Sequence, residues 1–322
     1  MPFTSPFGRR SRRFFGAGYG IPWPVAACLL GVLGALASPA AAQDLEPRAY
    51  VAAPVGLNFV AASASHSSGG VLLDTSLPIE DVNASVNAFV FGYGRTFALA
   101  GHTALIVAAL PVAHFEATGR VGNDIGRATR SGLGDARIRL SVNLLGGRAL
   151  TPREFVRAPR PTIVGVSFTV APPNGQYDRT KLVNIGANRW SFKPEIGVSH
   201  RRGRWTVEGY TGAWLFTATD SFYPGDAHRT QRPIVAIQLH ASYTLKPGWW
   251  VAGNGTWYAG GETTVNGVSR GDLQRNSRLG ATLSLPLGRR QSLKILASTG
   301  ATTRRGTDFK TIAAAWQLSW FD

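Results

Sequence analysis

The sequence has few charged residues, one cysteine and no long apolar run beyond its N-terminus. Charged residues make up 16% of the 322 residues, whereas about a quarter is usual in soluble domains. The single cysteine, Cys28, lies in the N-terminal leader, so a mature chain has neither a disulfide nor thiolate chemistry. Since no later apolar run is long enough to span a membrane as a helix, a helical membrane protein is excluded.

Acidic residues are scarce as well. The chain has 18 Asp and Glu against 34 Lys and Arg, and a formal net charge of +16. Such a charge suggests nucleic-acid binding, but the basic residues are scattered, with no helix, finger or aromatic platform to present them. We therefore expect no nucleic-acid partner. Lipopolysaccharide phosphates around the loops, or an anion-favouring lumen, are the more natural partners of this charge.

Residues 1–42 have the order of a cleaved export signal peptide. Arginines come first, an apolar run extends over residues 25–37, and Ala40, Ala41 and Ala42 form a small-residue cleavage site. The apolar run is too short to span a membrane as a helix. Residues 11–15 also resemble a twin-arginine signal, so the sequence leaves the export route open.

Residues 135–144 alternate without a break between polar and apolar side chains. This period of two is typical of a strand with one wet and one apolar face. About a dozen such segments follow one another, each about 10 residues long, which is the length of a tilted strand that spans a bilayer. The predicted strands are 58–66, 83–93, 103–115, 134–145, 161–171, 189–200, 204–216, 233–245, 249–260, 277–285, 291–300 and 310–321.

Long and short connections alternate between these strands. The long ones are 67–82, 116–133, 172–188, 217–232 and 261–276. Transmembrane barrels show the same asymmetry, with long loops outside and short periplasmic turns. The sequence thus predicts an all-β fold, a single transmembrane antiparallel barrel of about 12 strands over 58–322. Residues 43–57 form an N-terminal segment that is either periplasmic or tucked into the lumen.

This fold implies a place in the bacterial outer membrane. The expected partners are outer-membrane lipid and lipopolysaccharide, the barrel-assembly machinery and small-molecule solutes. Outward aromatic side chains near the strand ends fit the two interfacial girdles of such a barrel. They are Trp190, Trp205, Tyr243, Trp249, Trp257, Trp316 and Trp320.

One connection on the side of the short turns, residues 146–160, is longer than the others. Within it Thr151, Pro152, Arg153 and Glu154 form a capping box with proline at the first helical position. We expect a short periplasmic helix here.

The short turn at 201–204 also predicts a register. If Arg202 and Gly203 form a two-residue turn, Val198 lies opposite Val207 and Glu195 lies opposite Tyr210. The two strands then agree on which face is wet.

Charged and polar side chains gather on the lumen face of the predicted strands. On facing walls they could form a transverse field that orients polar solutes at a constriction. Equally, they could fill the lumen as paired side chains that serve stability, because an eight-stranded barrel is filled and a sixteen-stranded one is open. The set is Asp135, Arg137, Arg139, Lys193, Glu195, Glu208, Gln238, His240 and Arg278.

Three large aromatic side chains also face inward: Tyr210, Trp214 and Tyr258. They could form a stacking path for aromatic solutes or fill gaps in the lumen. Together with the charged set they make up the candidate lumen and substrate path.

An enzyme is the least favoured reading. His240 and Ser242 share a strand face, as a base and a nucleophile might, but positions two apart on a strand are separated by about 7 Å, too far for a hydrogen bond. The histidines have no metal-ligand spacing, and no phosphate-binding glycine loop occurs. We expect no catalytic residues, no metal and no cofactor.

Five stretches resemble the outer-membrane protein family named for the MetA pathway of phenol degradation. They are 44–50, 54–59, 131–135, 188–195 and 274–280. The resemblance implies a barrel transporter that takes up aromatic or other hydrophobic compounds, and it supplies no substrate-site motif.

We therefore expect an outer-membrane channel for passive passage of small solutes, aromatic or hydrophobic ones among them. The alternative is a barrel closed by its own side chains, with a structural or surface-binding role through basic loops. A lipase-like barrel enzyme is the third reading.

Overall fold

The computed structural model describes residues 45–72, 80–121, 124–181, 183–223 and 225–322. The signal peptide predicted over 1–42 lies outside the described residues. Within these ranges, no helix has both the length and the apolar character needed to cross a membrane.

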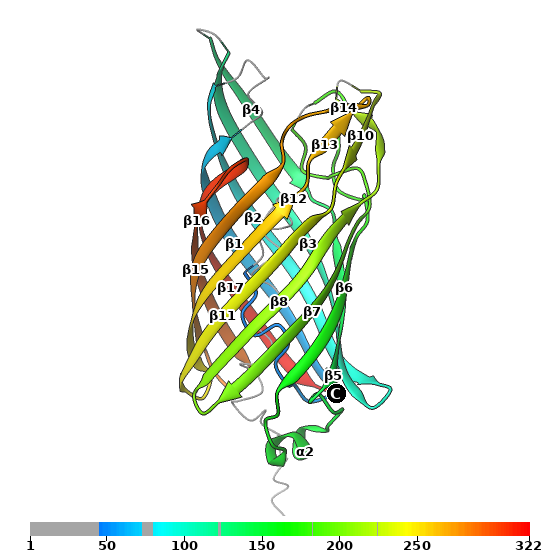
Figure 1. Ribbon diagram of the computed structural model, residues 1–322. Helices are drawn as coiled ribbons and strands as arrows, with labels where there is room; N and C mark the ends of the chain where they lie inside the picture. Colours follow the sequence, from blue (N-terminus) through cyan, green and yellow to red (C-terminus); the bar gives the residue numbers. More distant parts are fainter. Residues whose placement is uncertain (1–44, 73–79, 122–123, 182, 224) are drawn as a thin grey trace, which may run out of the picture.

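Twelve antiparallel strands close into one barrel (Figure 1), which confirms the predicted fold class. Each strand pairs with the next along the chain, and the first pairs with the last to close the wall. β4 and β5 both pair with β3 and together make one wall strand. The strands are β1 (Leu57–Leu72), β2 (Glu80–Leu99), β3 (His102–Val121), β4 (Asp124–Leu133) with β5 (Arg137–Leu145), β6 (Ile163–Ala171), β7 (Ser191–Arg202), β8 (Trp205–Phe216), β11 (Ile234–Lys246), β12 (Trp249–Gly260), β15 (Gln274–Pro286), β16 (Gln291–Thr302) and β17 (Gly306–Phe321).

The outer face of the barrel is apolar. Phe91, Leu239 and Ile312 are 59%, 64% and 59% exposed, and similar side chains occur on nearly every strand. A belt of this size would be an aggregation surface in water, whereas lipid tails cover it without cost. Predicted outward aromatic residues lie on the same face, where Trp190, Trp205 and Trp257 are exposed and the ring of Trp205 packs edge-on against Tyr243 at 5.0 Å.

The two ends of the barrel differ. At one end the connections are short, apart from the one that carries the helix α2 (Pro152–Arg157). At the other end, four short strands form a second sheet above the barrel wall (Figure 1). They are β9 (Thr219–Phe222), β10 (Ala227–Gln231), β13 (Thr263–Val265) and β14 (Val268–Ser269).

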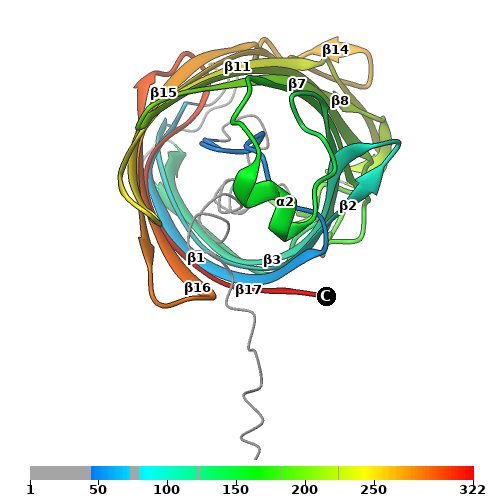
Figure 2. The ribbon, with the colours of Figure 1, turned by 90° about the horizontal axis from the view of Figure 1, so that it is seen from below.

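The capping box predicted at 151–154 is confirmed. The Thr151 hydroxyl accepts a hydrogen bond from the Glu154 backbone N–H at 3.4 Å, and the Glu154 carboxylate accepts one from the Thr151 N–H at 2.8 Å. The helix lies across the barrel opening when the molecule is viewed from that end (Figure 2). Its Phe155 is buried in a cluster that includes Phe59 and Leu105 of the inner wall, so α2 covers part of this mouth.

Two of the predicted long loops are wrong. The described residues of 67–82 and 116–133 belong to strands, because β1 extends to Leu72, β2 begins at Glu80, β3 extends to Val121 and β4 spans Asp124–Leu133. The cause is that the outward side chains there, such as Ser68 and Glu116, are polar. The apolar alternation therefore ends while the strand pairing continues.

The predicted register of the β7–β8 hairpin is also wrong, by two residues. The turn is Gly203–Arg204, with a φ of 60° at Gly203, and Arg202 lies opposite Trp205. Positive φ at the first turn position is what a tight hairpin turn requires, and glycine meets it at low cost. Val198 therefore faces Gly209, and Tyr210 faces Gly197 rather than Glu195. A slip of two leaves every side chain on its predicted face.

Candidate functional site

Residues 45–56 lie inside the barrel, upstream of β1. The backbone N–H groups of Glu46, Arg48 and Ala49 donate to wall side chains: to Gln238 Oε1 at 3.3 Å, to Glu208 Oε2 at 2.6 Å and to the Tyr210 hydroxyl at 3.1 Å. We call residues 45–56 the lumen segment.

The lumen segment reaches from one side of the barrel to the other. Its first residues bond to β8 and β11, as described above. Its last residues bond to the opposite wall, where Thr96 of β2 donates to Pro54 O at 2.7 Å and Thr103 of β3 donates to Ala53 O at 3.4 Å. The segment thus crosses the passage.

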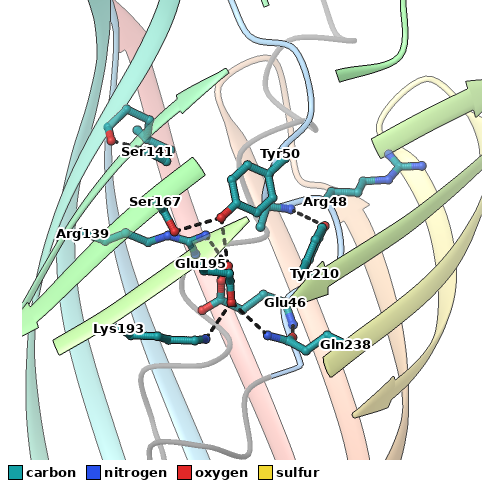
Figure 3. Close-up of polar contacts among 12 residues, drawn as sticks. Glu46, Arg48, Tyr50, Arg139, Ser141, Ser167, Lys193, Glu195, Tyr210 and Gln238 are labelled. Carbon is teal, nitrogen blue, oxygen red and sulfur yellow. Dashed lines mark hydrogen bonds and ion pairs between the residues drawn. The ribbon is translucent and has the colours of Figure 1, made fainter. Parts of the chain in front are cut away.

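The Glu195 carboxylate is the centre of the polar contacts (Figure 3). It pairs with Arg139 Nη2 at 3.0 Å and with Lys193 Nζ at 2.8 Å, and it accepts a hydrogen bond from the Tyr50 hydroxyl at 3.0 Å. Arg139 also pairs with Glu46 of the lumen segment. The side chains of Glu195 and Lys193 are 2% and 6% exposed. Two cations and two carboxylates therefore balance one another in a buried network.

Arg48 fixes the segment to a second part of the wall. Its Nε donates to Ser242 Oγ at 3.1 Å and its Nη2 to Thr244 Oγ1 at 2.9 Å, both on β11. The guanidinium lies over the Trp250 ring of β12 at 4.4 Å. The cation is thus satisfied by hydroxyls and an aromatic face.

Most of the predicted lumen residues meet at the lumen segment. Arg139, Lys193, Glu195, Glu208, Tyr210 and Gln238 form one connected group with it. His240 lies beside this group, with its ring 5.1 Å from that of Tyr210 and its Nδ1 2.9 Å from Asn254 Oδ1.

The other predicted residues lie elsewhere in the lumen. Trp214 and Tyr258 pack together with Ile234, and the Arg137 guanidinium lies 5.7 Å from the Trp214 ring. Arg278 of β15 binds the neighbouring strands, donating to Ser298 Oγ of β16 at 3.1 Å and to Phe309 O of β17 at 2.8 Å.

Asp135 binds the connection between β6 and β7. Its carboxylate accepts hydrogen bonds from the backbone N–H groups of Gly175 at 2.8 Å and Ala187 at 2.7 Å. It sits in the break between β4 and β5, and it holds the connection between β6 and β7 against the wall.

The sequence did not identify Glu46, Arg48, Tyr50, Lys294 or Phe155 as site residues. Glu46, Arg48 and Tyr50 have a signal in retrospect, because these charged and aromatic residues stand two positions apart just before the first strand. Their side chains face lumen groups of matching polarity. Lys294 is buried on β16 with its Nζ 6.0 Å from the Trp250 ring, and its alternation alone would have placed it inward.

His240 and Ser242 have separate partners. The His240 ring bonds to Asn254, and the Ser242 hydroxyl accepts from Arg48 Nε and points to Thr206 O at 3.5 Å. The arrangement is that of a packed lumen and does not couple a base to a nucleophile.

Part of the inner wall is apolar. At the end with the long loops, Ala84 and Val86 of β2 and Phe309 of β17 form a buried cluster, and Phe115 of β3 packs against it. The lumen therefore has a charged part around the lumen segment and an apolar part on β1–β3 and β17. Two cavities beside the lumen segment have volumes of about 20 and 50 Å³, room for one or a few water molecules.

A closed barrel with an apolar belt, aromatic girdles and an occupied polar lumen defines the class of outer-membrane barrel proteins. The chain belongs to the family described as "Putative MetA-pathway of phenol degradation", whose model matches residues 63–316. The family resemblance seen in the sequence is thereby confirmed.

Solved structures with the same fold include the COG4313 outer membrane channel from Pseudomonas putida F1. It is 19% identical, with a TM-score of 0.74 over 85% of this chain and 99% of that chain. The β domain of the Bordetella autotransporter BrkA is 12% identical, with a TM-score of 0.48 over 83% of this chain and 100% of that chain. The first of these likenesses shows the fold. No curated protein sequence is significantly similar to this one.

Proposed function

We propose that the protein is an outer-membrane channel for small apolar solutes, monoaromatic compounds among them, and that the lumen segment closes it in the conformation described. The observation that carries the proposal is the apolar cluster of Ala84, Val86, Phe115 and Phe309 inside the barrel mouth. A lumen that served only water and ions would be lined by polar side chains. The family description, which refers to phenol degradation, supports the same class of solute.

Passage in this proposal requires the lumen segment to move. The two cavities of about 20 and 50 Å³ beside it are far smaller than an aromatic ring. The segment is held by hydrogen bonds and ion pairs, and it has no strand pairing to the wall before β1. Its displacement would leave the barrel itself intact.

The alternative function is a permanently closed barrel with a structural or surface-binding role. The observation in its favour is the buried network around Glu195, in which carboxylates and cations are balanced. Side chains paired in this way fill a barrel and stabilise it.

Conductance in a planar bilayer, together with uptake of phenol by liposomes, separates the two functions. The protein refolded from residue 43 is compared with a variant that carries Glu46→Ala, Arg48→Ala and Tyr50→Ala. We expect low current from the first and steady current and phenol uptake from the second. Arg202→Ala, at an exposed position beside a turn, is the control and behaves as the unaltered protein. The triple variant is first shown to be folded by its heat-shifted gel mobility. If it then gives no current and no phenol uptake, the result supports the closed barrel.

The same proposal assigns the setting of the protein. The leader of residues 1–42 is removed on export, the barrel-assembly machinery inserts the chain, and lipopolysaccharide surrounds the loop end. The apolar belt supports the membrane setting, and N-terminal sequencing of protein isolated from outer membranes tests the cleavage. The role is transport rather than catalysis. We therefore expect no hydrolytic activity from the unaltered protein, and none for Ser242→Ala to remove.

A further inference from the structure

Two arginines, one buried and one half-buried, lie close together at the loop end of the lumen. Arg189 lies two residues before the start of β7 and is 8% exposed, and its guanidinium lies over the Phe216 ring at 4.3 Å. Arg229 of β10 lies over the Phe222 ring at 4.8 Å. Both cations therefore have an aromatic ring on one side.

The donors of Arg189 are incompletely used. Its Nη2 donates to Gln231 Oε1, whereas its Nε and Nη1 are buried and have no hydrogen-bond acceptor among the described residues. These two nitrogens carry three N–H groups. Buried donors of a charged group that lack an acceptor are costly, and a native structure that keeps them calls for a water, an ion or a ligand that supplies the acceptor.

The carboxylates nearest to the two arginines are already engaged. Asp135 accepts from Gly175 N–H and Ala187 N–H, as described above. Asp272 accepts from the Thr263 N–H and hydroxyl, both at 2.7 Å. Neither carboxylate is among the hydrogen-bond partners of Arg189.

The electrostatics favour an anion at this place. Burial, and then repulsion from Arg229, lower the pKa of Arg189 to about 9, although Asp135 and Tyr177 act in the opposite direction. Burial likewise lowers the pKa of Arg229. A bound anion would offset the cost of burying the two positive charges and weaken the repulsion between them.

An aromatic surface adjoins the cations. Phe216 packs against the cluster of Trp214, Ile234, Ala236 and Tyr258. The Trp214 indole N–H is also buried without an acceptor in the part of the chain that the structure describes. The place thus offers cationic donors on one side and flat apolar rings on the other.

We propose that Arg189 and Arg229 bind the carboxylate of a small aromatic acid, whose ring lies against Phe216. The planar guanidinium matches the two oxygens of a carboxylate better than a spherical anion. The proposal deepens the channel function, on which it rests, by naming a solute class and the first place where that solute is held.

Isothermal titration of the refolded protein in detergent with benzoate tests the site. Arg189→Gln and Arg229→Gln are compared with the unaltered protein, and Arg189→Lys keeps the charge while removing the planar fork. Arg232→Gln is the matched control, because Arg232 belongs to the same loop, is 75% exposed and pairs with Glu262 at 3.3 Å.

We expect benzoate to bind the unaltered protein and the control equally, and the two Gln variants about tenfold or more weakly. Arg189→Lys is expected to bind with intermediate affinity. Equal binding by Arg189→Gln, folded by heat-shifted gel mobility, would overturn the site. Benzamide and acetate are expected to bind more weakly than benzoate, and acetate or inorganic phosphate that binds as tightly would overturn the aromatic class.

The outcome is independent of the conductance experiment. Binding of benzoate by a protein that never conducts or takes up phenol would refute the channel and keep the site. Conduction without benzoate binding would keep the channel and refute the site.

Discussion

At the scale of single residues, Tyr50 connects the lumen segment to the wall most directly. Its hydroxyl is 2.8 Å from Ser167 Oγ and donates to Glu195, and its ring packs edge-on against Tyr210 at 5.1 Å. The Ser167 and Glu195 contacts depend on the hydroxyl alone, whereas the Tyr210 contact depends on the ring.

Tyr50→Phe should therefore loosen the lumen segment and leave the barrel folded. Loss of the hydroxyl leaves Glu195 with one donor fewer, at a cost of about 1–3 kcal/mol. Hydrogen exchange at the amides of residues 46, 48 and 49 measures the effect, and we expect it to accelerate about tenfold or more. Tyr223→Phe, at a loop residue 43% exposed, is the control. Unchanged exchange would show that the ring alone holds the segment.

Glu154 gives α2 a pH dependence. Hydrogen bonds from the backbone and the side chain of Thr151 lower the pKa of Glu154. A carboxyl whose pKa is lowered by folding stabilises the helix at pH values above the ordinary pKa of about 4.3. This contribution is lost as the pH falls through the lowered pKa. An NMR titration of the carboxyl carbon should show the lowered pKa in the native protein and a return toward the ordinary value in Thr151→Ala. Identical titrations would mean that the capping box does not form in solution.

How far the sequence could reach is clearest at this scale. Alternation placed Lys193, Glu195, Tyr210 and Gln238 on the lumen face, because facing depends only on the parity of the position. Their partners could not be foreseen. Glu46 bonds to a residue 192 positions away, and a contact over such a distance depends on the closed barrel and not on any local pattern.

At the scale of elements, the β7–β8 hairpin separates facing from register. The side-chain pattern fixes which face each residue takes, whereas the turn fixes which residues are opposite. The sequence allowed both Arg202–Gly203 and Gly203–Arg204 as the turn, and a slip of two costs nothing in the pattern. The positive φ at Gly203 decides between them.

Engineered disulfides test that register. Directly opposite residues have Cβ atoms about 4.5–5.5 Å apart and diagonal ones about 7–8 Å, and a disulfide requires the shorter distance. Val198→Cys with Gly209→Cys should cross-link on mild oxidation, and Val198→Cys with Val207→Cys should not. A mature chain lacks the leader cysteine Cys28, so no native thiol competes. Cross-linking of the second pair alone would restore the register predicted from the sequence.

At the scale of the whole molecule, the lumen wall has an excess of positive charge once the lumen segment is displaced. The wall contributes Arg137, Arg139, Lys193, Arg278 and Lys294 against Glu195 and Glu208. Their sum predicts an anion-selective passage, in keeping with the basic composition of the chain.

The triple variant described above should accordingly conduct chloride in preference to potassium. In a gradient of KCl across a planar bilayer, its reversal potential is expected to have the sign of the chloride equilibrium potential. Adding Lys294→Gln to the triple variant should move the reversal potential toward zero. A preference for potassium would mean that Glu195 and Glu208 govern the lumen.

The closing seam has a consequence for the order of assembly. β1 pairs with β17 along its full length, from Leu57 opposite Phe321 to Leu72 opposite Gly306. That partner is the last strand of the wall to leave the ribosome, so β1 presents an open hydrogen-bonding edge throughout export and insertion. The residues directly upstream of that edge are the ones that end inside the barrel. The final zipping of the seam is therefore also the step that shuts them in.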